Sequence, residues 1–276
     1  MTTKAARTVC LAAMGLLSCA WPVFGETYSF GVVPQENLAV LSRLWLPLLD
    51  VLAQKTGVKI QFETAPSIEE FNARCRQGRY DFIYVNPYVY VQDGRAAGYA
   101  AFAREAGRMH GILVVARKSP IRRVADLKGK RIAFPDPQSF GGTFLNKQLL
   151  KASGLDLERD VSVSYLSSHD DAYQAVLNGL SDAAGGVPRT FGLLPPQARA
   201  RLRVLARTPG VTTLPFAAQR RVPAAAVESV ARALTGLADD ERGRKLLEAV
   251  GIKRIVRAAD ADWDDVRRLA AGGFAR

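Results

Sequence analysis

The sequence predicts a two-lobed α/β protein, and three observations lead to this prediction. Short apolar segments of strand length alternate with helical segments along most of the chain. These units fall into two similar sets, each of which opens with its own strand, loop and helix. The chain has 276 residues, of which 48% are apolar and 23% charged, so it is long enough for two ordinary globular domains.

The first 25 residues have the pattern of an export signal. Lys4 and Arg7 precede an uncharged apolar stretch at 9–20, which is too short for a stable membrane anchor. We expect cleavage after Gly25, which makes residues 1–25 a signal peptide. The run that ends at Cys19 also resembles a lipobox, so a lipid anchor at Cys19 is the alternative.

Removal of this leader leaves an exported protein with a single cysteine. Lys4 and Arg7 are lost with no acidic residue, so the net charge falls from +12 to +10. Cys75 remains alone and cannot form an intrachain disulfide; we expect it to be a small buried hydrophobic residue. No later stretch is apolar enough to span a bilayer, so the sequence predicts a periplasmic protein.

The first set of elements begins with a strand that ends at Pro34. The next segment carries apolar residues at helical spacing and stops at Gly57, and Ser67 with Glu70 forms a capping box before the following helix. The predicted elements are strands at 28–34, 58–65, 80–86, 99–105 and 111–117, helices at 38–55 and 68–77, and a short helix from Pro87.

The second set repeats this order, and three helices then complete the chain. Its predicted elements are strands at 131–135, 161–166, 182–187 and 202–206 and helices at 142–153 and 170–178, followed by a strand at 214–219 and helices at 223–237, 239–250 and 262–271. Such units favour mostly parallel sheets. We place lobe 1 at 26–116 plus 213–276 and lobe 2 at 117–212, joined by two crossing strands with a ligand cleft between them.

The loop after the strand at 131–135 has the composition of an anion site. A helix N-terminus offers unpaired amides and a partial positive charge. Gly141 and Gly142 allow an oxyanion to approach the backbone closely, and Ser139 and Thr143 can add hydroxyl donors. The alternative is an ordinary Ser-capped helix start.

Three other strand ends carry candidate ligand contacts. His169 stands at a helix start and could donate to an anion, or it could be a surface histidine held by the neighbouring Asp170. Asn86 and Tyr88 follow a buried strand, where polar and aromatic groups commonly line pockets. Arg189 could clamp an oxyanion with two nitrogens, or it could pair with an acidic side chain.

The charge balance and the rare residues exclude several classes of function. The basic residues are scattered without a nucleic-acid-binding motif, so we expect anionic small molecules rather than nucleic acid as partners. Two histidines and no Cys/His cluster predict that there is no metal site and no cofactor. No catalytic triad or carboxylate pair emerges, so we expect a binding protein rather than an enzyme.

Taken together, several short motifs resemble the periplasmic substrate-binding proteins of phosphate, phosphite and phosphonate ABC transporters. The likeness runs from about residue 28 to 247. The motifs are Phe30-Gly31-Val32-Val33-Pro34-Gln35, Asp81 with Asn86-Pro87-Tyr88, Asp126-Leu127-Lys128-Gly129-Lys130-Arg131, Asp136-Pro137 with Ser139, Ser168-His169-Asp170 and Asp182-Ala183-Ala184.

This resemblance implies a type II periplasmic-binding-protein fold that closes on a small oxyanion. It implies anion contacts at Ser139, Gly141, Gly142 and His169, and pocket contacts near Pro34, Gln35 and Tyr88. Two departures stand out. The helix start reads Ser139-Phe140-Gly141-Gly142 where phosphonate binders typically have Ser-Thr-Ser-Gly, and Arg189 stands where an acidic residue would pair with an aminophosphonate amine.

The expected function is therefore capture of a phosphate, phosphite or phosphonate anion and its delivery to an ABC permease. The alternative is a ligand sensor that reports to a membrane sensor kinase, or the binding of a different small anion. Both functions use the same closure of two lobes. We expect a monomer in either case.

Overall fold

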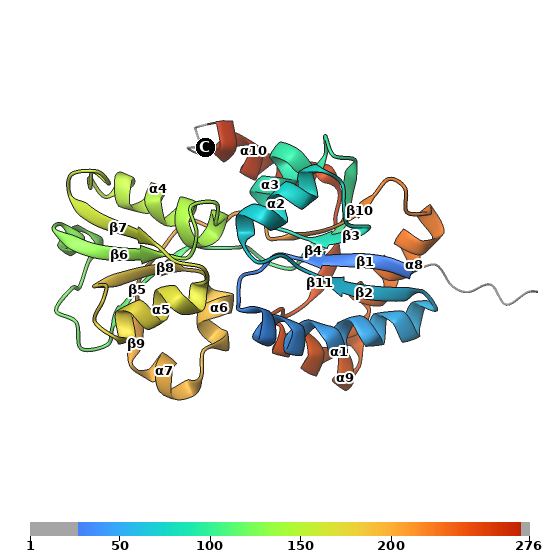
Figure 1. The fold of residues 1–276 in the computed structure, drawn as a ribbon, viewed down its shortest axis with the longest axis horizontal. Helices are drawn as coiled ribbons and strands as arrows, with labels where there is room; N and C mark the ends of the chain where they lie inside the picture. The colour runs from blue at the N-terminus through green and yellow to red at the C-terminus, as the bar shows by residue number, and fades with distance from the viewer. Residues whose placement is uncertain (1–26, 272–276) are drawn as a thin grey trace, which may run out of the picture.

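The buried strands form two separate sheets, one at the centre of each lobe (Figure 1). The computed structural model describes residues 27–271, so the predicted signal peptide and Cys19 lie outside the described residues. The first sheet has the order β11-β4-β10-β3-β1-β2, and the second has the order β7-β6-β8-β5-β9.

The strands of the first sheet are β1 (Thr27–Val32), β2 (Lys59–Glu63), β3 (Phe82–Tyr84), β4 (Tyr99–Glu105), β10 (Pro215–Gln219) and β11 (Ile255–Arg257). Those of the second sheet are β5 (Ile112–Ala116), β6 (Lys130–Phe134), β7 (Val161–Tyr165), β8 (Ala183–Gly186) and β9 (Leu202–Arg207). We call the parts of the molecule built on these sheets lobe 1 and lobe 2.

Both sheets are mixed, whereas mostly parallel sheets were expected. β1 is parallel to β2 and β3, and β6 is parallel to β7 and β8. β10 is antiparallel to β3 and β4, and β5 is antiparallel to β8 and β9. The reason is topological: β5 and β10 each follow a crossing between the lobes, so they enter their sheet from the side that the parallel strands run toward.

The pairing of β5 also corrects the first lobe join. The join was expected near residues 115–119, with residues up to 116 in lobe 1, but β5 belongs to the second sheet. The chain therefore crosses at 106–111 and returns at 208–214. Met109 and Val211 form a bridge between the two crossing segments.

The helices cover both faces of the sheets and are α1 (Leu38–Thr56), α2 (Ile68–Arg76), α3 (Pro87–Val89), α4 (Leu145–Ala152), α5 (His169–Leu177), α6 (Pro188–Leu193), α7 (Pro196–Ala200), α8 (Ala224–Thr235), α9 (Glu241–Ala249) and α10 (Asp264–Ala271). Single 3₁₀ or π-helical turns stand at Tyr90–Gly94, Val124–Leu127, Phe140–Phe144, Leu237–Asp239 and Asp260–Trp263.

Local sequence signals explain most helix ends. Ser67 caps α2 by accepting a hydrogen bond from the Glu70 amide, as predicted, and Gly57 ends α1 at a φ of 72° that favours glycine. The prediction missed α6, α7 and β11. These are short elements of six, five and three residues, below the length at which periodicity is informative.

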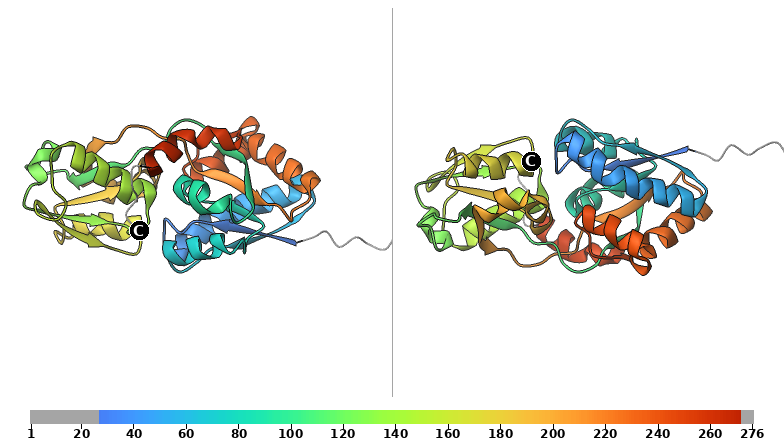
Figure 2. Two further views of the ribbon diagram at one scale, coloured as in Figure 1. Left: turned by 90° about the horizontal axis from the view of Figure 1, so that it is seen from above. Right: turned by 90° about the horizontal axis from the view of Figure 1, so that it is seen from below.

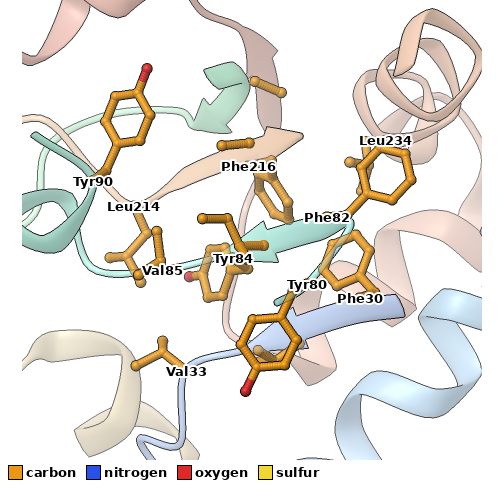
Figure 3. Close-up of a cluster of buried hydrophobic side chains, with 14 of the residues drawn as sticks. Phe30, Val33, Tyr80, Phe82, Tyr84, Val85, Tyr90, Leu214, Phe216 and Leu234 are labelled. Carbon is orange, nitrogen blue, oxygen red and sulfur yellow. The ribbon is translucent and has the colours of Figure 1, made fainter. Parts of the chain in front are cut away.

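Aromatic packing dominates the core of lobe 1. Phe30 of β1, Phe82 of β3 and Phe216 of β10 lie together on the sheet (Figure 3). Trp45 of α1 covers them and lies 4.8 Å from the Tyr84 ring, centroid to centroid. Cys75 of α2 is buried, consistent with its expected structural role, and burial raises its thiol pKa well above the usual range.

The C-terminal helix braces the two crossing segments, beside which it lies in Figure 2. The Asp265 carboxylate accepts hydrogen bonds from the Arg108 guanidinium at 2.7 Å and from the Thr212 amide at 2.9 Å. Trp263 donates from its indole to the carbonyl of Thr213. One carboxylate thus ties both crossings to lobe 1.

Two helical glycines provide a test of this packing. A Cβ on Gly243 of α9 would lie 1.8 Å from the Leu237 carbonyl oxygen, whereas a Cβ on Gly192 of α6 would meet nothing within 4 Å. We expect Gly243→Ala to lower the free energy of unfolding by about 1–3 kcal/mol. Gly192→Ala should be neutral or stabilising by up to about 1 kcal/mol. Chemical denaturation measures both, and equal effects would contradict the packing described.

Candidate functional site between the lobes

Loops from both sheets meet where the lobes touch. The strands β1, β3, β6, β7 and β8 all end at this contact, and each is followed by a loop or a helix start. The carboxyl ends of parallel strands are where ligands of open α/β sheets bind. The residues predicted from the sequence as ligand contacts lie at this edge of each sheet.

We use the name anion loop for the loop that follows β6 and contains Ser139 and Thr143. Hydrogen bonds within lobe 2 hold it in place. Ser139 caps the turn at Phe140–Phe144 by accepting a hydrogen bond from the Gly142 amide at 3.3 Å. The Thr143 hydroxyl donates to the Asp136 carbonyl at 2.6 Å, so that proton is already used within the loop. The Asn146 side-chain amide donates to the carbonyls of Gly141 and Gly142, which fixes the position of the loop.

The two glycines of this loop are required by close neighbours. A Cβ on Gly141 would lie 2.5 Å from Cγ1 of Val187, and a Cβ on Gly142 would lie 2.6 Å from Cε1 of His169. Larger residues would push these neighbours away from the loop. The glycines thus bring Val187 and His169 against a helix start, and they leave the Gly141 amide without a partner among the described residues.

His169 is buried without any hydrogen-bond partner. Neither ring nitrogen is bonded within the described residues, although the side chain is fully buried. Burial, with the nearby Arg189 charge, lowers the pKa of His169 to about 3, so the ring is neutral at pH 7. A neutral imidazole offers one donor and one acceptor. A buried polar group without a partner costs about 1–3 kcal/mol, so a ligand that supplies these bonds would bind favourably.

Lobe 1 presents two further unpartnered polar atoms to the same contact. Gln35 and Glu36 follow β1, and both side chains are buried. The Gln35 carbonyl oxygen accepts a hydrogen bond from the His169 amide at 3.4 Å, which places the two lobes side by side here. Oε1 of Gln35 and Oε2 of Glu36 have no partner among the described residues.

Arg189 links the lobes by a buried ion pair. Its Nη1 donates from lobe 2 to Oε1 of Glu36 and to the Val250 carbonyl of lobe 1, both at 3.3 Å. Glu105 and Tyr84 of lobe 1 lie close by and are hydrogen-bonded to each other. Burial raises the pKa of Glu105, while Arg189 and Tyr84 oppose that rise.

Tyr88 and Asn86, the two residues predicted as contacts after β3, have different surroundings. The Tyr88 ring stacks on Phe140 of lobe 2, with centroids 5.9 Å apart and planes 18° apart, so Tyr88 closes one side of the contact. Asn86 caps α3 through Oδ1, and its Nδ2 is buried with no partner among the described residues. The Asn72 amide reaches Gln138 across the same side at 2.9 Å.

Two pockets with different lining residues open at this contact. One of about 590 Å³ is lined by Glu36, Asp171 and apolar residues of α1 and β2. The other, of about 390 Å³, lies beside the crossing segments and is lined by Gln35, Glu105, Val187 and Arg189 among others. We call the second one the hinge pocket.

Sequence reasoning did not single out Glu36, Glu105 and Val187. Glu36 adjoins the predicted Gln35 at the end of β1, where a charged residue directly after a buried strand was a usable signal. Glu105 and Val187 gave none, because Glu105 ends a long strand at the crossing and Val187 is an ordinary apolar residue. Among residues 27–271, no helix is long and apolar enough to cross a membrane, and no group of three His, Cys, Asp or Glu side chains could hold a metal ion.

The sequence also matches known proteins. A family model described as "ABC transporter, phosphonate, periplasmic substrate-binding protein" matches residues 30–263. The phosphate-import protein PhnD of Mycolicibacterium smegmatis is 26% identical over 175 residues, which is 58% of this chain and 54% of that protein. The tetrathionate sensor histidine kinase TtrS of Salmonella typhimurium is 27% identical over 192 residues, 66% of this chain and 32% of the kinase. The chain thus spans about half the length of the phosphate-import protein and about a third of the length of the kinase.

A solved structure confirms the expected fold class. PhnD1 from Prochlorococcus marinus, determined in complex with methylphosphonate, matches with a TM-score of 0.77 and 17% identity. The match covers 89% of this chain and 97% of that one. At this identity the likeness concerns the fold, which is that of a two-lobed type II periplasmic binding protein.

The buried His169 predicts a specific acid sensitivity. Because folding favours the neutral ring, its contribution to stability is complete above about pH 6.5 and is lost as the pH falls toward 3. Between pH 7 and pH 5 this residue alone should remove about 2 kcal/mol from the parent. His169→Gln lacks that loss, so its Tm should fall less over the same interval in thermal unfolding. Equal falls in parent and variant would contradict the burial of the ring.

Proposed function

This chain belongs to the family of periplasmic substrate-binding proteins of phosphonate ABC transporters, and on that premise we propose that it captures a small oxyanion between its lobes and delivers it to an ABC permease. The observation that carries the proposal is the pair of unpartnered nitrogens on the fully buried His169. The His169 ring lies against Gly142 at a helix N-terminus, which is a kind of position that binds anions, and the His169 amide contacts the opposite lobe.

The ligand would complete the hydrogen bonds that the two lobes leave open. An oxyanion oxygen can accept from the Gly141 amide and from His169, two donors of lobe 2 that have no partner among the described residues. On lobe 1, Oε1 of Gln35 and Oε2 of Glu36 are acceptors without a partner among the described residues, so these two atoms suit an oxyanion that retains one proton. Such a ligand bonds to both lobes only when they are closed, and it therefore shifts the population toward the closed form.

The relatives support the phosphorus oxyanions as the first ligands to test. One relative is a phosphate-import protein, and the solved structure holds methylphosphonate. We also propose that the protein works in the periplasm as a monomer after loss of residues 1–25, or with a lipid anchor if Cys19 becomes the first residue. Its permease would recognise the closed form.

Calorimetric titration of the exported protein, refolded to remove carried-over ligand, tests the proposal. The titrated anions are phosphate, phosphite, methylphosphonate, 2-aminoethylphosphonate, sulfate, nitrate and tetrathionate. We expect one phosphorus oxyanion to bind tightly. His169→Ala should weaken it by about tenfold or more, and Ser139→Ala to a smaller degree, because each removes a group at the anion loop.

Ser162→Ala is the matched control, because Ser162 is an exposed residue of β7 in the same lobe. It should bind like the parent. Unchanged affinity in both His169→Ala and Ser139→Ala would contradict the placement of the anion, and no binding to any phosphorus oxyanion would contradict the proposed ligand class.

A sensor function is the second candidate, and the match to the sensor kinase TtrS over 66% of this chain favours it. Deletion of the gene in its native host separates the two. Loss of uptake of the bound anion supports delivery to a permease. Intact uptake with loss of an anion-dependent transcriptional response supports a sensor instead.

A further inference from the structure

The hinge pocket carries more positive charge than the proposed oxyanion site requires. Four of its lining side chains are basic, namely Arg108, Arg189, Arg207 and Lys253. A single acidic side chain, Glu105, lines it as well. Glu105 is hydrogen-bonded to Tyr84, so one carboxylate stands against several cations in this pocket.

Two of these cations form no ion pair within the part of the chain that the structure describes. Arg108 pairs with Asp265, and Arg189 pairs with Glu36. Arg207 and Lys253 are exposed at the pocket and form no ion pair with any described residue. Arg189 uses only Nη1 in its recorded bonds, so Nε and Nη2 remain available as donors.

The hinge pocket is also continuous with the proposed oxyanion site. Val187 and Met109 line the pocket and are the neighbours of Gly141 in the anion loop. Gln35 lines it too, and its carbonyl meets the His169 amide. The rest of a ligand whose oxyanion group is held at the anion loop would therefore extend past Val187 into the hinge pocket. The pocket volume of about 390 Å³ is suited to a small molecule.

We propose that the hinge pocket binds a second acidic group of the ligand, so that the protein selects small oxyanions with two separated anionic ends. Arg207 and Lys253 supply the charge at the outer side, and Arg189 supplies donors at the inner side. This inference rests on the proposed function, because the first anionic group occupies the anion loop. A ligand with a cationic tail is disfavoured by the same three side chains.

Three phosphonates with the same head and tails of equal length test the proposal. 3-Phosphonopropionate ends in a carboxylate, propylphosphonate in a methyl group and 2-aminoethylphosphonate in an ammonium group. In calorimetric titrations of the exported protein, we expect 3-phosphonopropionate to bind about tenfold or more tightly than propylphosphonate. 2-Aminoethylphosphonate should bind more weakly than propylphosphonate.

Charge-removing variants locate the effect. In the double variant Arg207→Gln with Lys253→Gln, the preference for the carboxylate tail should fall to within about twofold. The matched control is Arg43→Gln with Lys118→Gln, which removes two exposed cations outside the pocket that have no recorded ion pair. It should keep the full preference. Both double variants change exposed side chains, and thermal unfolding verifies that they fold.

The outcomes separate the two proposals. Binding of propylphosphonate with no preference for the carboxylate tail, or a preference that survives in the pocket variant, overturns this inference and leaves the proposed function standing. A lack of binding by all three phosphonates overturns this inference. It contradicts the proposed ligand class as well only where phosphate and phosphite also fail to bind.

Discussion

A buried arginine determines how the two lobes meet. Arg189 leaves lobe 2 at the start of α6 and donates to Glu36 and to the Val250 carbonyl of lobe 1. Burying this charge is unfavourable unless it is paired, so the guanidinium fixes Glu36 and holds the loop after β1 against lobe 2. The same contact buries His169 and Gln35, whose open hydrogen bonds form the candidate site. Removing either partner of the ion pair would leave an unpaired buried charge.

The topology explains why these groups converge. The parallel strands of both sheets run toward the contact, so the loops after β1, β6, β7 and β8 gather there. β5 and β10 enter from the crossings and run the opposite way. The crossings stay close to one another because Met109 pairs with Val211 and Asp265 binds both segments.

The sequence was informative wherever a local rule governed the structure. Periodicity located the long helices, and Ser67 and Gly57 marked helix ends. The composition of the loop from Ser139 to Thr143 predicted an anion site there, and that site stays a prediction. The sequence could not predict contacts between residues far apart in the chain. No local pattern shows that β5 belongs to the second sheet, and none shows that Arg189 pairs with Glu36. The Thr143 hydroxyl was predicted as an anion donor, but its proton is used by the Asp136 carbonyl. That bond depends on the fold of the loop and not on its composition.

The central claim is that an oxyanion sits between the anion loop and His169. A crystal structure of the exported protein with the tightest-binding phosphonate tests it directly. The account predicts an oxyanion oxygen within about 3.2 Å of a His169 ring nitrogen and of the Gly141 amide, with the lobes closed. An anion bound elsewhere, with His169 still unpartnered, would contradict the account.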